Sequence, residues 1–252
     1  MILDRVLFLA AYTPRSQAYA QAMVNAGMEP DNVLLFGRPP SSSRTPALPD
    51  LRTTDLGDLF LPDFREPLEA TCSRAGWSIR RSPADGVNHP DVAAILSELR
   101  PRTVLYSGYG GQLVSPQVLD LGIDFLHLHA GWLPDFPGST TIYYSWIKER
   151  RCGVTALLLD KNIDSGPIVG RRHYPVPPRG LDVDHLYDGA IRADLLVRVL
   201  RDFGTRGRFS AVTETPTSLS YYVIHPILKH LALLSQDTEG SPPTSTPRKN
   251  SP

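Results

Sequence analysis

Short apolar runs alternate with amphipathic segments along most of this 252-residue chain. The first run, Val6 to Ala11, is almost continuously apolar, as expected for a strand that is buried on both faces of a parallel sheet. Each later run is short enough to be a strand and is followed by polar or turn-forming residues. These further predicted strands cover residues 33–36, 77–81, 103–106, 125–129 and 154–160.

The segments between these runs carry the signals of helices. Pro14 and Ser16 begin a helix that continues through Asn25 and ends before Gly27, where a glycine is well suited to stop it. Residues 184–203 form the longest predicted helix, because their apolar side chains recur at helical spacing. Shorter helices are expected over residues 67–75, 88–99, 116–121 and 142–148.

This alternation predicts an α/β fold, with a Rossmann-like, mostly parallel twisted sheet and helices on both faces. We expect a catalytic domain over residues 1–205 and a C-terminal strand and helix appendage over residues 206–234. Residues 235–252 are rich in Ser, Thr, Pro and charged residues, so we expect a disordered tail. Residues 39–62 have a similar composition and are expected to form a long surface connection.

Composition narrows the range of partners. Lys plus Arg and Asp plus Glu both total 26, so the chain lacks the net basic charge typical of nucleic-acid-binding proteins. The apolar runs are too short to span a bilayer, and the N-terminus lacks the features of a signal peptide. Only Cys72 and Cys152 are present, which suits a reducing compartment. We therefore expect a cytoplasmic protein with small-molecule ligands and neither nucleic-acid nor membrane partners.

The sequence also lacks two common devices for binding nucleotides. No Gly-x-Gly-x-x-Gly run follows the first strand, and no phosphate-binding loop with a Walker-type lysine is present. Nucleotide binding by those devices is therefore disfavoured.

The segment between His127 and Gly166 has the densest chemistry. Residues two apart on a strand point to the same side, so His127 and His129 are expected to present two imidazoles together. A loop rich in Gly and Pro follows them, and Asp164 lies in a turn-rich stretch directly after the next strand. Ligands of open α/β sheets usually bind at the carboxyl ends of strands.

Three interpretations fit this group. The histidines could be polar residues at a strand end whose hydrogen bonds are satisfied by the backbone. They could bind zinc or iron, with Asp164 or His173 as a third ligand. They could also carry out metal-free acyl transfer, in which an imidazole moves a proton, a donor stabilises the oxyanion and a carboxylate orients the group.

Five motifs follow one another between Asn88 and Ile168. They are Asn88-x-Pro90, Tyr109-Gly110, His129-Ala-Gly-Trp-Leu-Pro134 with Gly138, Gly153-Val-Thr155 and Asp160-x-x-Ile-Asp-Ser-Gly166. In order and spacing they resemble the catalytic domain of the folate-dependent formyltransferases, the group that includes methionyl-tRNA, glycinamide ribonucleotide and amino-sugar formyltransferases. The resemblance favours metal-free acyl transfer and implies that no metal site is present.

The resemblance implies a role for each residue of the group. Family catalysis uses an Asn, a His and an Asp, and His129 and Asp164 occupy the last two positions. His127 stands at the Asn position, where an imidazole N–H could replace the amide as hydrogen-bond donor. Two neighbouring departures, Pro137 for a frequent Arg and Gly131 for the usual Ser, concern recognition of the acceptor.

The resemblance also implies 10-formyltetrahydrofolate as the formyl donor and a small-molecule amine as the acceptor. The residues expected to contact the folate lie in two loops, and they are Tyr106, Gly108, Tyr109, Gly110, Leu113, Lys161, Asn162 and Ile163. The residues expected to contact the acceptor follow the catalytic histidine, and they are Trp132, Pro134, Gly138, Ser139 and Thr140. The acceptor is expected to be an amino sugar, an amino acid or a biosynthetic intermediate.

Alternatives from other classes remain. One is a hydrolase that releases formate from formylated folate or uses the His-x-His pair to hold zinc, and another is a non-catalytic ligand-binding relative. Tyr221 to Pro226 followed by residues 227–234 predicts the strand and helix of the appendage, which is also a candidate interface for a homodimer. Arg192 and Asp194 are interpreted as a solvated face of the late helix or a structural ion pair.

Overall fold

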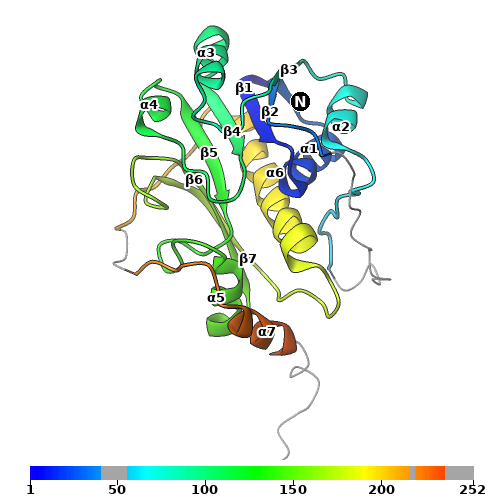
Figure 1. The fold of residues 1–252 in the computed structure, drawn as a ribbon, viewed down its shortest axis with the longest axis vertical. Coiled ribbons are helices and arrows are strands. Elements are labelled where there is room, and N and C mark those ends of the chain that lie inside the picture. The colour runs from blue at the N-terminus through cyan, green and yellow to red at the C-terminus, as the bar shows by residue number, and fades with distance from the viewer. Residues whose placement is uncertain (41–55, 216–218, 236–252) are drawn as a thin grey trace, which may run out of the picture.

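A computed structural model describes residues 1–40, 56–215 and 219–235. Its centre is a seven-stranded sheet with the strand order β3-β2-β1-β4-β5-β6-β7, shown in Figure 1. The first five strands are parallel to one another, whereas β6 runs antiparallel to β5 and β7 antiparallel to β6. The strands are β1 (Ile2–Ala11), β2 (Glu29–Phe36), β3 (Ile79–Ser82), β4 (Thr103–Ser107), β5 (Asp124–His129), β6 (Cys152–Leu158) and β7 (Ile168–Tyr174). The predicted α/β class with a mostly parallel sheet is confirmed.

Helices cover both faces of this sheet. They are α1 (Pro14–Asn25), α2 (Leu68–Arg74), α3 (Pro90–Leu99), α4 (Pro116–Leu119), α5 (Thr141–Glu149), α6 (Asp188–Arg206) and α7 (Pro226–Leu234). The side chains of β1 alternate between two cores: Phe8 packs with α1 and α6, whereas Leu7 and Leu9 pack with α3 and α4. Helices α1 and α6 lie side by side against the sheet (Figure 1). This alternation explains why β1 is apolar at nearly every position.

The predicted late helix has an irregular first turn. A π-helical turn, η1 (Val183–Tyr187), precedes α6 where the sequence predicted a single helix from residue 184. The carbonyl oxygen of Asp182 accepts hydrogen bonds from the backbone N–H groups of both Leu186 and Tyr187, which widens the turn. Apolar spacing does not reveal this difference, because the same residues face the core in either geometry.

The predicted strand at Tyr221 to Pro226 is wrong. Within the described part of the appendage, only isolated bridges are formed, Gly138 with Tyr221 and Ile168 with Val212. The segment pairs with a loop over one residue, so it cannot form a continuous ladder. The predicted helix that follows is present as α7.

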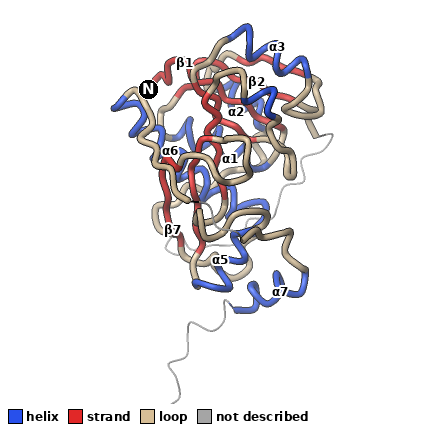
Figure 2. Tube along the Cα trace, turned by 90° about the vertical axis from the view of Figure 1, so that its left-hand side faces the viewer, coloured by secondary structure: helices blue, strands red, loops and turns tan. Residues whose placement is uncertain are grey.

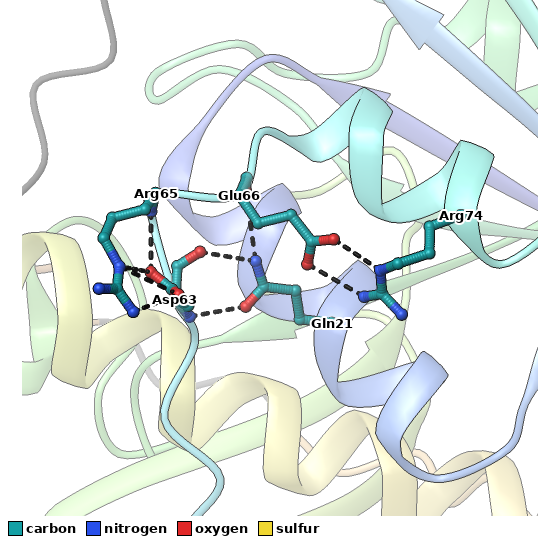
Figure 3. Close-up of polar contacts among 5 residues, drawn as sticks. All are labelled: Gln21, Asp63, Arg65, Glu66 and Arg74. Atoms are coloured by element: carbon teal, nitrogen blue, oxygen red, sulfur yellow. Dashed lines mark hydrogen bonds and ion pairs between the residues drawn. The ribbon is translucent and has the colours of Figure 1, made fainter.

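A hydrogen-bonded side chain attaches the connection before α2 to α1. Gln21 of α1 is buried, and its Nε2 donates to the carbonyl oxygen of Asp63 at 2.8 Å while its Oε1 accepts from the Asp63 N–H at 2.7 Å (Figure 3). Arg65 and Arg74 lie on either side of this contact and pair with Asp63 and Glu66. The Arg65 guanidinium lowers the pKa of the Asp63 carboxyl to about 2.

Two expectations lie wholly or mostly outside the described residues. These are the tail after residue 235 and residues 41–55 of the predicted surface connection. In the described part of the chain, no helix is long and apolar enough to cross a bilayer. Both cysteines are buried and unpaired, and burial raises the pKa of the Cys72 thiol to about 12.

The strand order reverses between β1 and β4, and this is where open α/β sheets bind ligands. Polar side chains of α1, the helix that follows β1, reach the end of β4: the Ser16 hydroxyl lies 2.8 Å from the Ser107 hydroxyl, and Arg15 donates to the Gly108 carbonyl oxygen. The next strand along the sheet is β5, which carries the two histidines. The fold therefore places the predicted catalytic group beside the reversal point.

Candidate active site

The two histidines of β5 lie close together near the carboxyl end of the strand, as their spacing predicts. His129 is buried and His127 is partly exposed. Both project to the side of the sheet that carries Phe125 and Tyr106, and the Tyr106 and His127 ring centroids are 6.1 Å apart. The pair therefore lies between the sheet core and the loops at its edge.

Both ring nitrogens of His129 have partners. Its Nε2 lies 2.7 Å from the carbonyl oxygen of Phe136, and its Nδ1 lies 3.3 Å from Oδ1 of Asp164. Because a carbonyl oxygen can only accept, Nε2 carries a hydrogen. The hydroxyl of Thr141 donates to the Ala130 carbonyl oxygen and lies 3.2 Å from the same Nε2.

Asp164 reaches His129 from the turn between β6 and β7. Its backbone has a φ of +53°, an unusual value for a residue other than glycine, and its side chain is 9% exposed. Its second oxygen, Oδ2, accepts a hydrogen bond of 2.7 Å from the Gly138 N–H. A strained backbone held by a buried carboxylate is a feature of functional sites.

The contact between His129 Nδ1 and Asp164 Oδ1 is favourable only when a proton lies between the two atoms. With Nε2 protonated, a neutral imidazole would direct the Nδ1 lone pair at the carboxylate, and this contact would be repulsive. The observed approach is attractive when a proton lies between the two atoms. Burial lowers the pKa of His129, and the Asp164 carboxylate acts in the opposite direction and raises it.

His127 is held neutral by its surroundings. Its Nδ1 atom is buried and makes no hydrogen bond of normal geometry with the described residues. Burial lowers the pKa of His127 well below 6.5, and the positive charges of Arg15 and Arg192 add to the effect. A neutral imidazole keeps one N–H, so His127 can still donate a hydrogen bond.

The two arginines near His127 were missed as site residues in the sequence. Arg192 of α6 is largely buried, pairs with Asp188 at 2.9 Å and donates to the carbonyl oxygen of Leu128, between the two histidines. The interpretation of Arg192 as a solvated position is therefore wrong. Arg192 forms a structural ion pair with Asp188, whereas Asp194 pairs with Arg172 and Arg198. The i, i+4 spacing of Arg192 from Asp188 was visible in the sequence, whereas nothing there marked Arg15.

Thr155 and Gly131 shape the loop after β5. The Thr155 hydroxyl of β6 donates to the Gly131 carbonyl oxygen at 2.7 Å and accepts from the Leu133 N–H at 3.0 Å. A Cβ on Gly131 would lie 2.6 Å from both the Phe136 carbonyl oxygen and His129 Nε2. The glycine found where formyltransferases usually have Ser is therefore required by the short hydrogen bond between His129 and Phe136.

The residues predicted to contact folate lie on two loops and one strand. Tyr106 is buried in β4, and Gly108, Gly110 and Leu113 belong to the loop that follows, where the Leu113 side chain is 59% exposed. Tyr109 packs edge-on against Phe36 and lines a cavity of about 500 Å³ together with Arg38 and His89.

The second predicted folate loop lies between β6 and β7. Lys161 forms an ion pair with Asp120 at 3.1 Å, and the Asn162 N–H donates to Asp160. The Ile163 side chain is 61% exposed. This loop is joined to the active centre through Asp164.

The residues predicted to contact the acceptor fall into two groups. Trp132 lies between His173, whose ring is stacked 3.9 Å away, and the Arg171 guanidinium, and Pro134 follows it in the loop. Gly138, Ser139 and Thr140 instead lie beside the Asp164 carboxylate and the segment around Tyr221.

The residues described here do not form a metal site of the predicted kind. No group of three or more His, Cys, Asp or Glu side chains within residues 1–40, 56–215 and 219–235 is arranged to hold a metal ion. His173 stacks on Trp132, while both nitrogens of His129 face other partners.

Comparisons with known proteins agree with this geometry. The sequence profile described as Formyl transferase matches residues 66–195, just over half of the chain. The methionyl-tRNA formyltransferase of Chloroflexus aurantiacus is 35% identical over 116 residues, which are 44% of this chain and 36% of that protein. The chain thus matches little more than a third of the length of such curated relatives.

Solved structures share the fold. Glycinamide ribonucleotide transformylase 1 from Symbiobacterium toebii superimposes with a TM-score of 0.54 at 18% identity, covering 82% of this chain and 91% of that one. HypX from Aquifex aeolicus in complex with tetrahydrofolic acid has a TM-score of 0.51 at 18% identity, covering 89% and 30%. With the profile match across the catalytic segment, the chain belongs to the formyl transferase family.

Proposed function

We propose that this protein transfers a formyl group from 10-formyltetrahydrofolate to the amine of a small molecule in the cytoplasm. The observation that carries the proposal is the buried His129–Asp164 pair, closed by Phe136 and Gly138 and set beside the neutral His127. The membership of the chain in the formyl transferase family supports the same reaction.

The folate loops have features that suit a flat, partly apolar ring. Leu113 and Ile163 are exposed apolar side chains on the two loops, at 59% and 61% exposure, and the exposed Gly110 and Gly111 leave backbone groups of the first loop accessible for polar contacts. Binding sites for such ligands commonly combine apolar walls with a few polar backbone groups. The donor supplies the formyl carbon, and the chain contributes the groups that surround it.

Formyl transfer requires a hydrogen-bond donor for the formyl oxygen and an acceptor for the proton that the amine loses. When the acceptor amine attacks, negative charge develops on the formyl oxygen, and the N–H of His127 is the donor that stabilises it. The amine loses a proton to the His129–Asp164 pair, which returns it to the folate nitrogen as the old carbon–nitrogen bond breaks. Because both nitrogens of His129 are occupied, this exchange passes through the Asp164 carboxylate.

The charges around His127 favour a particular acceptor. Arg15 and Arg192 place two guanidinium groups beside the histidine, with Asp188 as the nearest counterion. The Tyr106 hydroxyl, beside the His127 ring, is buried without a hydrogen-bond partner among the described residues. Buried positive charge and free donors stabilise an anion. We therefore expect an amine that carries a carboxylate or phosphate, as in an amino acid, an amino sugar derivative or a biosynthetic intermediate.

The appendage supports a homodimer as a further part of this proposal. Ile227, Leu231 and Leu234 of α7 lie on one face of the helix and are 52–64% exposed. Apolar helix faces of this kind are usually covered by another protein surface.

Steady-state kinetics tests the proposed reaction. Purified protein is mixed with 10-formyltetrahydrofolate and a panel of acidic amines, and the release of tetrahydrofolate is followed. The wild type is expected to turn over at least one amine, and His129→Ala is expected to lose activity by at least about 100-fold, as loss of a general acid–base typically does. Equal rates for the two proteins would remove His129 from the mechanism.

A further inference from the structure

A C-terminal segment lies directly against the catalytic loop. The Tyr221 N–H donates to the Pro137 carbonyl oxygen at 2.9 Å, and the Ser139 N–H donates to the Tyr221 carbonyl oxygen at 2.7 Å. Three residues further on, the Ile224 N–H donates to Thr140 Oγ1 at 2.8 Å. Backbone groups of residues 221–224 thus bind residues 137–140 at three points.

The side chain of Tyr221 strengthens this attachment. Its ring stacks on Phe136, with centroids 5.5 Å apart, and packs against Tyr144 of α5 at 4.7 Å. The Lys148 ammonium donates to the Tyr221 hydroxyl at 3.0 Å and lies over the rings of both Phe136 and Tyr221. Aromatic pairs of this kind contribute about 0.5–1.5 kcal/mol beyond the area that they bury.

The loop held in this way contacts both ends of the His129–Asp164 pair. Phe136 provides the carbonyl oxygen that accepts from His129 Nε2, and Gly138 provides the N–H that donates to Asp164 Oδ2. Tyr221 therefore lies one contact away from each member of the pair. A shift of this loop would move both hydrogen bonds together.

Gly138 shows how closely the two segments approach. Its φ is +109°, and a Cβ at this position would lie 2.0 Å from the Tyr221 carbonyl oxygen. Only glycine allows this conformation and this contact at the same time. Gly138 at the end of the loop is therefore needed for the Tyr221 segment to pass this close.

Helix α7 anchors the far end of the segment. It lies beside α5 in both Figure 1 and Figure 2, and Lys229 of α7 pairs with Asp184, which also accepts from the Tyr143 hydroxyl of α5. The segment is therefore fixed at both ends to the elements that carry the catalytic loop.

We propose that Tyr221 is a positioning residue of the active centre. By fixing residues 136–140, it holds the Phe136 carbonyl oxygen against His129 and the Gly138 N–H against Asp164, and so fixes the surroundings of the His129 imidazole. The C-terminal segment is then part of the catalytic machinery. The kinetic consequence rests on the proposed formyl transfer, whereas the effect on His129 does not.

The test compares Tyr221→Ala with Tyr222→Ala, since the neighbouring Tyr222 side chain is 81% exposed. Titration of ¹³C-labelled histidine by NMR, in protein without folate, reports the pKa of His129 in each variant. Release of the loop lets water reach the imidazole. Because burial is the largest influence on the His129 pKa and outweighs the lost Phe136 hydrogen bond, the midpoint in Tyr221→Ala is expected to rise toward the unperturbed value of about 6.5. Tyr222→Ala and Tyr221→Phe, which keeps the ring, are expected to titrate like the wild type.

Kinetics gives the second readout. Tyr221→Ala is expected to lower kcat about 10- to 100-fold with little change in KM for formylated folate, because misplacement of about 1 Å has effects of that size. If Tyr221→Ala does not fold, Tyr221→Leu replaces it in both measurements. A His129 midpoint that stays at the wild-type value in a folded Tyr221→Ala or Tyr221→Leu protein overturns the proposal. If no variant or wild type transfers formyl groups but the midpoint shifts, the proposed function fails and the positioning role stands.

Discussion

His127 distinguishes this candidate active site from the usual formyltransferase pattern. An imidazole at the position where formyltransferases have an asparagine can act as a hydrogen-bond donor only while it keeps an N–H, and it must stay neutral to avoid repelling Arg15 and Arg192. Burial and these two arginines lower the pKa of His127, which satisfies the second condition. The substitution and the nearby arginines are therefore physically linked.

Replacing His127 with Asn tests this link through stability. In the folded protein the pKa of His127 lies below the value of about 6.5 expected in the unfolded chain. Between these two pKa values the unfolded chain binds more protons than the folded protein, so the free energy of unfolding falls as the pH drops from about 6.5 toward the folded-state pKa. His127→Asn removes this contribution, up to about 2 kcal/mol between pH 7.5 and pH 5. Urea unfolding at the two pH values measures it. An equal loss of stability in both proteins on acidification would contradict the neutral imidazole.

Gly131 is the second residue with a specific requirement. Gly131→Ser restores the residue usual in formyltransferases, yet it would place a Cβ 2.6 Å from the Phe136 carbonyl oxygen and from His129 Nε2. The backbone oxygen cannot move without breaking the hydrogen bond to His129. We expect at least a 10-fold loss of kcat and a destabilisation of about 1–3 kcal/mol, as for other overpacked sites. If Gly131→Ser keeps the wild-type kcat and melting temperature, the loop can hold the larger side chain and the inferred requirement for glycine is wrong.

At the scale of elements, α6 lies against β5, the strand that carries the two histidines. Arg192 donates to the Leu128 carbonyl oxygen and pairs with Asp188, so it joins the helix to β5 between the two histidines. Both side chains are largely buried, at 13% and 17% exposure. The strand and the helix are therefore coupled by a charged group in a region where charge needs a partner.

Arg192→Met leaves the Asp188 carboxylate without its partner and should therefore lower the free energy of unfolding. We expect a loss of about 3–5 kcal/mol in the free energy of unfolding, the usual result of removing one partner of a buried pair. The double variant Arg192→Met with Asp188→Asn should recover part of that loss, because no buried charge remains. Chemical denaturation of the wild type, both single variants and the double variant measures the coupling. A single-variant effect below about 0.5 kcal/mol would mean that the pair is solvated.

Element boundaries were predicted well where apolar spacing and end signals coincide. The helix from Pro14 to Asn25 was predicted at its observed bounds, because Pro14 and Gly27 mark its limits in the sequence. The segment around Tyr221 was misjudged as a strand because its aromatic and β-branched residues favour extended backbone. Its partner is an irregular loop, and no local signal reveals such a pairing.

At the scale of the whole molecule, the parallel sheet followed from alternating strands and helices. The apolar runs identified β1 to β6 but not β7, and they did not show that β6 runs antiparallel to β5 and β7 antiparallel to β6. The grouping of His127, His129 and Asp164 was predictable because two of them share a strand and the third follows a recognisable motif. Arg15, Arg192 and Tyr221 come from helices and a segment far apart in the chain, so only the fold brings them to the site.

The fate of a labelled formyl group tests the central claim most directly. Wild-type protein is incubated with 10-formyltetrahydrofolate carrying ¹³C in the formyl group and with the acidic amine panel, and ¹³C NMR follows the label. Formyl transfer by this site predicts a new formamide carbon on an amine with the wild type, and none with His129→Ala. Label that appears only as free formate would indicate a hydrolase, and label that stays on the folate would indicate a binding protein; either result would contradict formyl transfer at His127, His129 and Asp164.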